Sequence, residues 1–121
     1  MGAAIVLVVE DEALIRLDAV QMIEDAGYEV VEAANADAAI RILESRPDIH
    51  IVFTDVNMPG SMDGLKLARA IRDRWPPVHL IVTSGKHMVH PSDLPTGGRF
   101  IPKPYNARMV TSVLHDLAPL A

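Results

Sequence analysis

The sequence predicts an α/β domain built on a parallel sheet with helices on both of its faces. Short apolar runs alternate along the 121 residues with segments in which apolar residues recur at steps of three and four. The first run, residues 4–9, is continuous and rich in β-branched side chains, which is typical of a strand buried on both faces. The element order is β-α-β-α-β-α-β-loop-β-α, and this order favours parallel strands joined by right-handed crossovers.

Two helices and two further strands follow the first strand. Gly27 ends the first helix, and residues 28–32 are predicted to form a strand at an edge of the sheet. Asn35 is a suitable cap for the second helix, which stops before Pro47, and residues 49–54 form the third strand. The first helix is recognised by its apolar face, made up of Ile15, Ala19, Met22, Ile23 and Ala26.

The second half of the chain contains a helix, two strands and a last helix. Residues 63–75 form the third helix, which two prolines end, and strands are predicted over 78–82 and 99–101. The stretch 85–98 between these strands has little apolar periodicity, so at most a short helical turn is expected there. The last helix has an apolar face formed by Ala107, Val110, Val113, Leu114 and Leu117.

Length and composition limit the classes of function. A chain of 121 residues predicts one domain, without room for a second catalytic or DNA-binding domain. The net charge of −5 argues against direct binding of nucleic acid, and the absence of cysteine excludes a disulfide framework, a thiolate zinc site and a cysteine nucleophile. The longest apolar run is too short to cross a membrane, so a soluble cytoplasmic domain is expected. The third helix has a basic side that is expected to be a solvated face, formed by Arg69, Arg72 and Arg74.

Reactive side chains come directly after the predicted strands. Glu10 and Asp11 follow the first strand, and Asp55 follows the third. Thr83 ends the fourth strand, and Lys103 follows the fifth. Ligands of open parallel sheets bind at the carboxyl ends of the strands, so these side chains are expected to converge. Each has an ordinary interpretation when taken alone, such as the acidic first turn of a helix or a surface amine, and the joint pattern carries the prediction.

The acidic residues at this edge need a cation. Two carboxylates about 5 Å apart repel by roughly 3 kcal/mol at an effective dielectric constant near 20. A hard divalent cation such as Mg²⁺ relieves this repulsion while it binds only one or two carboxylates. With Lys103 on the opposite side, Asp55 is placed as a nucleophile that accepts a phosphoryl group, and Thr83 as a hydrogen-bond donor to that group.

These residues lie within four motifs: Val8-Val9-Glu10-Asp11-Glu12, Thr54-Asp55-Val56-Asn57-Met58-Pro59, Val82-Thr83-Ser84 and Phe100-Ile101-Pro102-Lys103-Pro104. Together they resemble the response-regulator receiver domain of two-component signalling, in its chemotaxis-regulator-like form. The resemblance covers nearly the whole chain, in the family's order and at receiver-like spacings. It implies a flavodoxin-like fold with a five-stranded parallel sheet in the order 2-1-3-4-5. It also implies a single receiver domain over residues 1–121, without an output domain in this chain.

The resemblance implies a phosphoryl acceptor and a metal site. Asp55 would take a phosphoryl group from a histidine kinase or a histidine phosphotransfer protein, in a reaction that needs Mg²⁺ or Mn²⁺. Asp11 and Asp55 would bind the metal through their carboxylates. Asn57 would bind it through its backbone carbonyl, and Glu10 would reach it through water.

The resemblance also implies a conformational switch. Lys103 would pair with Asp55 and then with the phosphoryl group, and Thr83 would move to donate a hydrogen bond to that group. Phe100 matches the family's switch aromatic, with a plain half-buried strand residue as the alternative. The bond between Lys103 and Pro104 resembles the family's cis peptide. The switched surface would comprise the family's fourth helix, the fifth strand and the last helix.

Two segments depart from the family's usual pattern. The loop 58–64 is one residue longer than the commoner form, and the fourth helix of the family is poorly supported in 85–98, which is rich in proline and glycine. By resemblance, Asn57 and Gly85 lie where water approaches the phosphoryl group. Because Gly85 leaves this approach open, a short-lived phosphoryl state is expected.

Other functions compete with the signalling domain. The resemblance implies no enzyme with turnover, only assistance to phosphorylation and slow self-dephosphorylation. An aspartyl-nucleophile phosphohydrolase would usually carry a second acid two residues after Asp55, where this chain has Asn57. An interaction module independent of phosphorylation would lack Asp11, Asp55 or Lys103, and all three are present. An unknown downstream protein and a phosphorylation-linked homodimer complete the expected partners, with no nucleic acid and no membrane.

Overall fold

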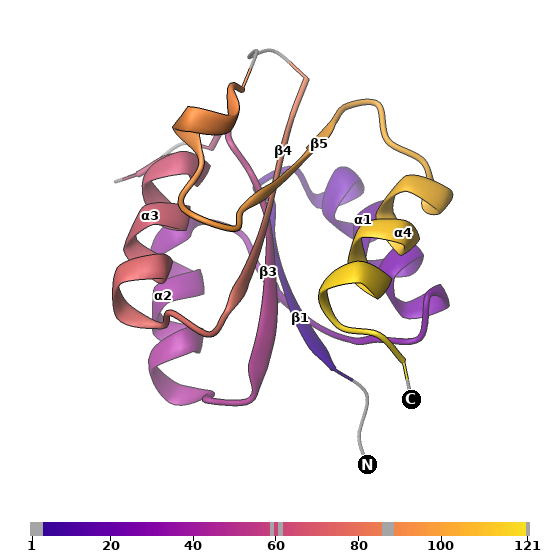
Figure 1. Ribbon diagram of the computed structural model, residues 1–121, viewed down its shortest axis with the longest axis horizontal. Coiled ribbons are helices and arrows are strands. Elements are labelled where there is room, and N and C mark those ends of the chain that lie inside the picture. Colours follow the sequence, from indigo (N-terminus) through magenta and orange to yellow (C-terminus); the bar gives the residue numbers. More distant parts are fainter. Residues whose placement is uncertain (1–3, 59, 61, 86–88, 121) are drawn as a thin grey trace.

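A parallel sheet of five strands lies between two layers of helices (Figure 1). The computed structural model describes residues 4–58, 60, 62–85 and 89–120. The strands are β1 (Ile5–Val9), β2 (Glu29–Ala33), β3 (Ile49–Asp55), β4 (His79–Ser84) and β5 (Arg99–Pro102). The helices are α1 (Ala13–Asp25), α2 (Ala36–Ser45), α3 (Gly64–Arg74) and α4 (Ala107–Leu117). Helices α1 and α4 cover one face of the sheet, and α2 and α3 cover the other.

The strand order β2-β1-β3-β4-β5 confirms the predicted sheet, and every pair of neighbouring strands is parallel. Every predicted strand and helix is present, with bounds within two residues of those expected. The strand predicted to lie at an edge, β2, does so. Within the described ranges, a helix with the length and hydropathy that a bilayer crossing requires is absent.

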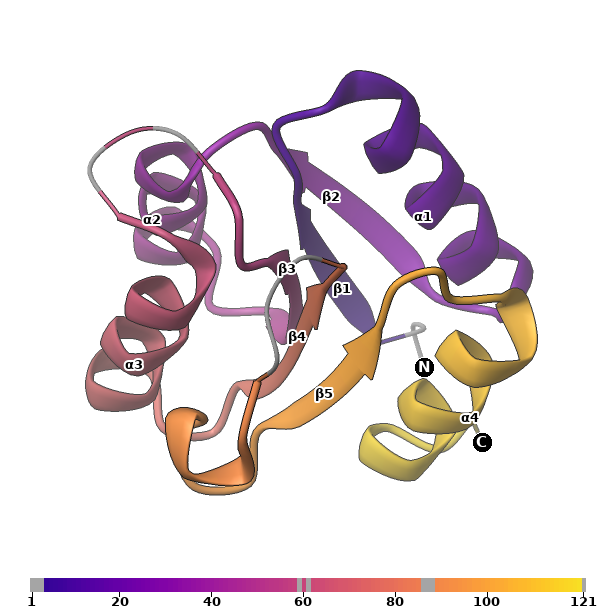
Figure 2. The same cartoon turned by 90° about the horizontal axis from the view of Figure 1, so that it is seen from above.

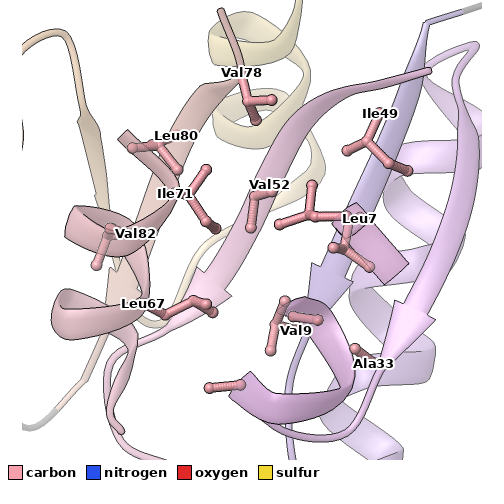
Figure 3. Close-up of a cluster of buried hydrophobic side chains, with 14 of the residues drawn as sticks. Leu7, Val9, Ala33, Ile49, Val52, Leu67, Ile71, Val78, Leu80 and Val82 are labelled. Atoms are coloured by element: carbon pink, nitrogen blue, oxygen red, sulfur yellow. The ribbon is translucent and has the colours of Figure 1, made fainter. Parts of the chain in front are cut away.

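The sheet divides the apolar core in two. Side chains alternate along a strand, so Val6 and Val8 of β1 pack with α1 and α4, whereas Leu7 and Val9 pack with α2 and α3. All of β1 is buried, which confirms the strand predicted from its continuous β-branched run. Because both faces are packed, the strands cannot slide without exposing apolar side chains. Figure 3 shows part of the second core, with Leu7, Val9, Val52, Leu67, Ile71, Leu80 and Val82.

Polar side chains cap three of the helices. Asn35 accepts a hydrogen bond from the backbone of Ala38 at 2.8 Å, as the sequence predicts. Asp63 accepts one from the backbone of Lys66 at 2.9 Å, and Asn106 caps α4 in the same way. Each such cap stabilises a helix by about 1 kcal/mol. The cap on α3 fixes the start of that helix beside the end of β3.

The segment 85–98 contains one turn of 3-10 helix, Pro91–Asp93, in its described part. The prediction of at most a short helical turn is confirmed for these residues. Residues 86–88 lie outside the described residues, as do Pro59 and Ser61 of the longer loop. The expectation of an extra residue in that loop therefore stays a prediction.

The arginines of α3 lie on the expected solvated side of the helix, where Arg69 and Arg74 are exposed, and each also contacts the protein. Arg69 donates to the backbone carbonyl of Asp93 at 3.1 Å. Arg72 is half-buried and donates to two backbone carbonyls, at 2.6 and 2.9 Å. Arg74 pairs with Glu44 of α2 at 2.8 Å. Arg69 and Arg72 thus supply hydrogen-bond donors to backbone carbonyls in the 3-10 turn and in the stretch after α3.

Candidate functional site

The carboxyl ends of the strands meet at the upper edge of the sheet in Figure 1, and Figure 2 looks down on this edge. Asp55 is the last residue of β3 and pairs in register with Thr83 of β4. Glu10 follows β1, and Lys103 follows β5. Backbone hydrogen bonds continue past the strand ends, as from the Lys103 amide to the carbonyl of Ser84 at 3.0 Å. The pairing of the strands therefore brings together side chains that are far apart in the sequence.

Three carboxylates form a compact cluster at this edge. One oxygen atom from each of Glu10, Asp11 and Asp55 lies within 4.8 Å of the other two. Glu10 and Asp55 are only 4% and 5% exposed, and Asp11 is half-buried. Glu10 and Asp11 precede α1, which begins at Ala13, so they are not an acidic first helical turn. Closely spaced carboxylate oxygens are the ligands that a hard divalent cation prefers.

Lys103 lies against this acidic cluster. Its Nζ atom is 3.3 Å from Oε1 of Glu10 and 3.4 Å from Oδ2 of Asp55. Among the side chains that the structure describes, one ammonium group contacts this cluster of three carboxylates, which leaves local negative charge and favours an additional cation. The stem of the lysine passes close to Gly85, where a Cβ atom would lie 3.2 Å from the Cβ of Lys103.

Two buried polar atoms of the edge lack a hydrogen-bond partner among the residues that the structure describes. They are Oδ1 of Asp55 and Oγ1 of Thr83. An unsatisfied buried polar atom costs about 1–3 kcal/mol. Because Asp55 and Thr83 pair in register on neighbouring strands, the two side chains lie side by side at the edge of the sheet. Both atoms can therefore form a hydrogen bond with the same ligand.

Burial controls the protonation of two groups near the cluster. Desolvation raises the pKa of Glu10 above its usual range, and the hydrogen bond from the Glu12 amide opposes this rise. The charge of Asp55 raises the pKa of Glu10 further, and Lys103 lowers it. Burial, with a smaller contribution from nearby acids, raises the pKa of Tyr105 to about 12. The hydroxyl of Tyr105 therefore stays protonated at neutral pH.

Two residues that the sequence analysis did not assign to the site support it. A Cβ atom at Gly64 would lie 1.9 Å from the carbonyl oxygen of Asp55, so the start of α3 packs directly on the backbone of that residue. Arg16 donates to the carbonyl of Glu10 at 2.7 Å and pairs with Glu32 at 3.1 Å. A glycine next to a helix cap was an available signal for the first contact. The contacts of Arg16 depend on the path of the loop after β1, which has no sequence signal.

The other predicted residues lie at or near this edge. Asn57 follows β3 and is half-buried. The peptide bond between Lys103 and Pro104 is cis, as the resemblance implies. Phe100 is a half-buried residue of β5 and lines a groove together with residues of the segment 89–98.

An apolar groove along α1 opens beside the acidic cluster. Leu14 and Leu17 of α1 are 82% and 62% exposed, which is unusual for such large apolar side chains. The same groove is lined by Gly85, Lys103 and Tyr105. The groove is thus continuous with the side chain that contacts Asp55.

Comparison with known proteins was consistent across sequence and structure. Residues 6–114 match the family model for the response regulator receiver domain. A sensor kinase, CckA of Brucella abortus (strain 2308), is 34% identical over 120 residues, which are 96% of this chain and 13% of that protein. A putative NtrX-like response regulator of Rickettsia bellii (strain RML369-C) is 37% identical over 81 residues, which are 66% of this chain and 17% of that protein. This chain therefore spans only a small part of the length of either relative.

Solved structures are similar over nearly the whole chain. A response regulator receiver protein from Sinorhizobium medicae WSM419 superposes with a TM-score of 0.87 and 27% identity, covering 95% of this chain and 94% of that one. The receiver domain of the hybrid histidine kinase CckA superposes with a TM-score of 0.77 and 31% identity, covering 93% and 97%. The TM-scores show that both share the fold of this chain.

Proposed function

The chain belongs to the response regulator receiver domain family, and we propose that it accepts a phosphoryl group on Asp55 in a Mg²⁺-dependent reaction. The environment of the Asp55 carboxylate carries this proposal. One of its oxygens lies 3.4 Å from the Lys103 ammonium group. The other is buried and has no partner among the described residues, although Glu10 and Asp11 stand close by.

The proposed donor is a phosphohistidine of a histidine kinase or a histidine phosphotransfer protein. A carboxylate oxygen of Asp55 attacks the phosphorus atom in line, so an O–P bond forms while the P–N bond to the imidazole breaks. The imidazole nitrogen leaves with the electron pair and takes a proton from solvent. Lys103 stays beside Asp55 and neutralises part of the charge on the phosphoryl oxygens. The similarity to the receiver domain of a hybrid histidine kinase supports a donor of this class.

The residues of the acidic cluster fit a magnesium ion, with manganese as a substitute. Asp11 and Asp55 would hold the metal through carboxylates, Asn57 through its backbone carbonyl and Glu10 through water. The oxygen donor set and the unpaired Oδ1 of Asp55 support this assignment. When bound, the ion offsets the repulsion among the carboxylates and the negative charge of the transferring phosphoryl group.

Thr83 and Lys103 are proposed to convert phosphorylation into a change of conformation. The hydroxyl of Thr83 is buried without a partner among the described residues, so a phosphoryl oxygen on Asp55 would give it an acceptor. Charge-assisted hydrogen bonds of about 1.5–3 kcal/mol each give roughly 3–6 kcal/mol for two. Reversal of a 1:99 equilibrium requires about 5.5 kcal/mol, so the two bonds are of the right size. Phe100 is the proposed aromatic of the switch.

The output of this switch is proposed to act through β5, α4 and the segment 89–98. The partner at this surface is an unidentified downstream protein or, after phosphorylation, a second copy of this chain. A cytoplasmic location belongs to the same proposal. The phosphoryl group is expected to be short-lived because Gly85 leaves a path for water, and a half-life of many hours with Mg²⁺ present would contradict this expectation.

The apolar groove along α1 is proposed to receive the phosphohistidine-bearing partner. Its lining includes Lys103, so a protein seated on Leu14 and Leu17 is next to the acceptor. Replacement of Leu17 by Asp should slow transfer from a phosphotransfer protein and leave phosphorylation by a small acyl phosphate unchanged. Equal slowing of both reactions would contradict the docking role.

The competing functions have less support. A phosphohydrolase needs a proton donor near the nucleophile, and the amide of Asn57 does not titrate. A phosphorylation-independent interaction module would not need the complete set of Asp11, Asp55 and Lys103. Steady turnover of a phosphate ester would revive the first alternative.

Intact-mass measurement after incubation with a small acyl phosphate and Mg²⁺ tests the proposal. We expect one added phosphoryl group, which is lost in the Asp55→Asn variant and in the presence of a chelator. An adduct that persists in the Asp55→Asn variant would overturn the assignment of the acceptor.

A stable fluoroberyllate complex separates two reasons for a missing adduct. Binding of fluoroberyllate without a detectable adduct would indicate fast hydrolysis. The absence of both would favour the interaction module.

A further inference from the structure

We propose that Arg16 is a positioning residue for the metal site, because it fixes the loop that presents Glu10 and Asp11. This role rests on the proposed Mg²⁺-dependent function of the site. Arg16 lies near the start of α1, and its side chain contacts the backbone of Glu10, the residue that follows β1. It does not belong to the acidic cluster itself.

The guanidinium group of Arg16 joins two parts of the chain. Its NH1 group donates to the backbone carbonyl of Glu10 at 2.7 Å, which is a short hydrogen bond. Its Nε group donates to Oε1 of Glu32 at 3.1 Å, at the end of β2. The side chain of Arg16 is 21% exposed and that of Glu32 is 51% exposed, so the pair is partly shielded from solvent. The loop after β1 is thereby tied to the neighbouring strand.

Glu10 is held at four points, and Arg16 supplies one of them. Its amide donates to the carbonyl of Ala33 at 3.1 Å. Its carboxylate accepts from the amide of Glu12 at 3.2 Å and from Lys103 at 3.3 Å. The bond from Arg16 holds the carbonyl, and the peptide unit that contains this carbonyl leads directly to Asp11. A shift of this peptide unit would therefore move both carboxylates.

The planar fork of arginine suits this task. It can hold a carbonyl and a carboxylate at the same time in a fixed geometry, whereas a lysine ammonium group is a flexible point charge. Groups that orient metal ligands from outside typically change metal affinity 10–100-fold when they are removed. The loss of Arg16 is expected at the low end of this range, because three other bonds to Glu10 remain.

A positioning role and a purely electrostatic role of Arg16 predict opposite changes in the affinity for Mg²⁺ when this side chain is removed. The positively charged guanidinium group of Arg16 contacts the backbone of Glu10, a member of the acidic cluster. On electrostatic grounds alone its removal would strengthen the binding of a cation. If Arg16 positions the loop, its removal weakens binding despite the more negative surroundings. The sign of the change therefore separates the two roles.

Titration calorimetry with Mg²⁺ at fixed ionic strength, on the full chain, tests the inference. We expect Mg²⁺ to bind about tenfold more weakly to Arg16→Ala, and Arg16→Lys to lie between this variant and the natural chain. Arg46→Ala is a matched control, since it removes an exposed arginine paired with Asp48 at 2.8 Å. Thermal unfolding without metal shows whether each variant is folded, and phosphorylation by acyl phosphate as a function of Mg²⁺ concentration gives a second readout.

The outcomes distinguish this inference from the proposed function. Unchanged or tighter binding of Mg²⁺ by Arg16→Ala would overturn the positioning role and leave the proposed function intact. No binding of Mg²⁺ by the natural chain would overturn both. An equal loss of affinity in Arg46→Ala would show that the loss does not depend on the contact between Arg16 and Glu10, and it would also overturn the positioning role.

Discussion

The edge of the sheet around Asp55 and the segment 89–98 are built by different means. At the edge, Asp55 and Thr83 are 5% and 1% exposed, and strand pairing sets their positions. In the described segment 89–98 every residue is half-buried or exposed. Its contacts with the rest of the molecule include apolar packing of Val89 and Leu94 and a hydrogen bond from Arg69.

This difference separates the chemistry of the domain from its output. Buried positions set by a packed sheet open only with much of the fold, whereas exposed segments held by few contacts open locally at low cost. The reactive edge can therefore keep one geometry while the segment 89–98 changes its contacts. The proposed switch would therefore change the conformation of the segment 89–98, which is the less stable of the two regions.

Gly64→Ala should produce the largest effect, because it acts on the rigid edge. A Cβ atom at this position would lie 1.9 Å from the carbonyl oxygen of Asp55, and backbone atoms cannot give way cheaply. We expect the free energy of unfolding to fall by about 3 kcal/mol, as for severe overpacking. Phosphorylation should fall as well, since α3 or Asp55 must move. Urea denaturation followed by circular dichroism measures the first effect, and intact mass measures the second.

Gly98→Ala is the matched substitution in the other region. A Cβ atom there would lie 3.0 Å from the carbonyl oxygen of Pro95 and 3.3 Å from the Cβ of Leu94, in a stretch that can adjust. Its cost should be well below that of Gly64→Ala, with phosphorylation unchanged. Equal costs at the two glycines would break the distinction between a rigid edge and an adjustable segment.

Glu10→Gln should raise the free energy of unfolding of the metal-free protein and should weaken the binding of Mg²⁺ at the site. Burial raises the pKa of Glu10 above its ordinary value of 4.5, so the folded state holds this proton more tightly than the unfolded state. The free energy of unfolding then falls as pH rises through the interval between these two pKa values. Glutamine removes this dependence and is expected to add about 1 kcal/mol at pH 7, because the loss of the Lys103 pair offsets part of the relieved repulsion.

Denaturation with a chelator present, at several pH values, tests this expectation. Asp48→Asn is a control of opposite sign, because the hydrogen bond from Arg46 lowers the pKa of Asp48. The ionised carboxylate of Asp48 stabilises the folded state at neutral pH, and this stabilisation is lost as the pH falls through the lowered pKa of Asp48. Destabilisation by Glu10→Gln at pH 7 would show that burial of the charge is not the main influence on Glu10.

Sequence periodicity was sufficient for the helices, the strands and their convergent ends, whereas the strand order was implied by the resemblance to receiver domains. The continuous apolar run of β1 and the spaced apolar residues of the helices specify buried faces, and the order of elements then implies parallel strands. Asp55 and Lys103 could be placed at one edge because each directly follows a strand. The contact that joins them, at 3.4 Å, agrees with that placement.

Contacts that depend on the path of a loop could not be predicted from the pattern of side chains in the sequence. Arg16 and Gly64 act through backbone carbonyls, and neither the carbonyls nor their directions appear in a pattern of side chains. The contacts that the arginines of α3 make with backbone carbonyls were not predicted for the same reason. Arg72 is held by carbonyls whose positions are set by the chain after α3.

Arg69→Ala should have the smallest effect on stability and should act only on the adjustable region. The variant loses the hydrogen bond from an exposed arginine to the carbonyl of Asp93, worth about 0.5 kcal/mol. Amide hydrogen exchange in the segment 89–98 should become faster, while the rate of phosphorylation by a small acyl phosphate stays unchanged. Arg46→Ala controls for the loss of an arginine at a distant exposed ion pair. If Arg69→Ala instead changed the phosphorylation rate, the segment would be coupled to the reactive edge before any phosphoryl group is present, and the separation of chemistry from output would fail.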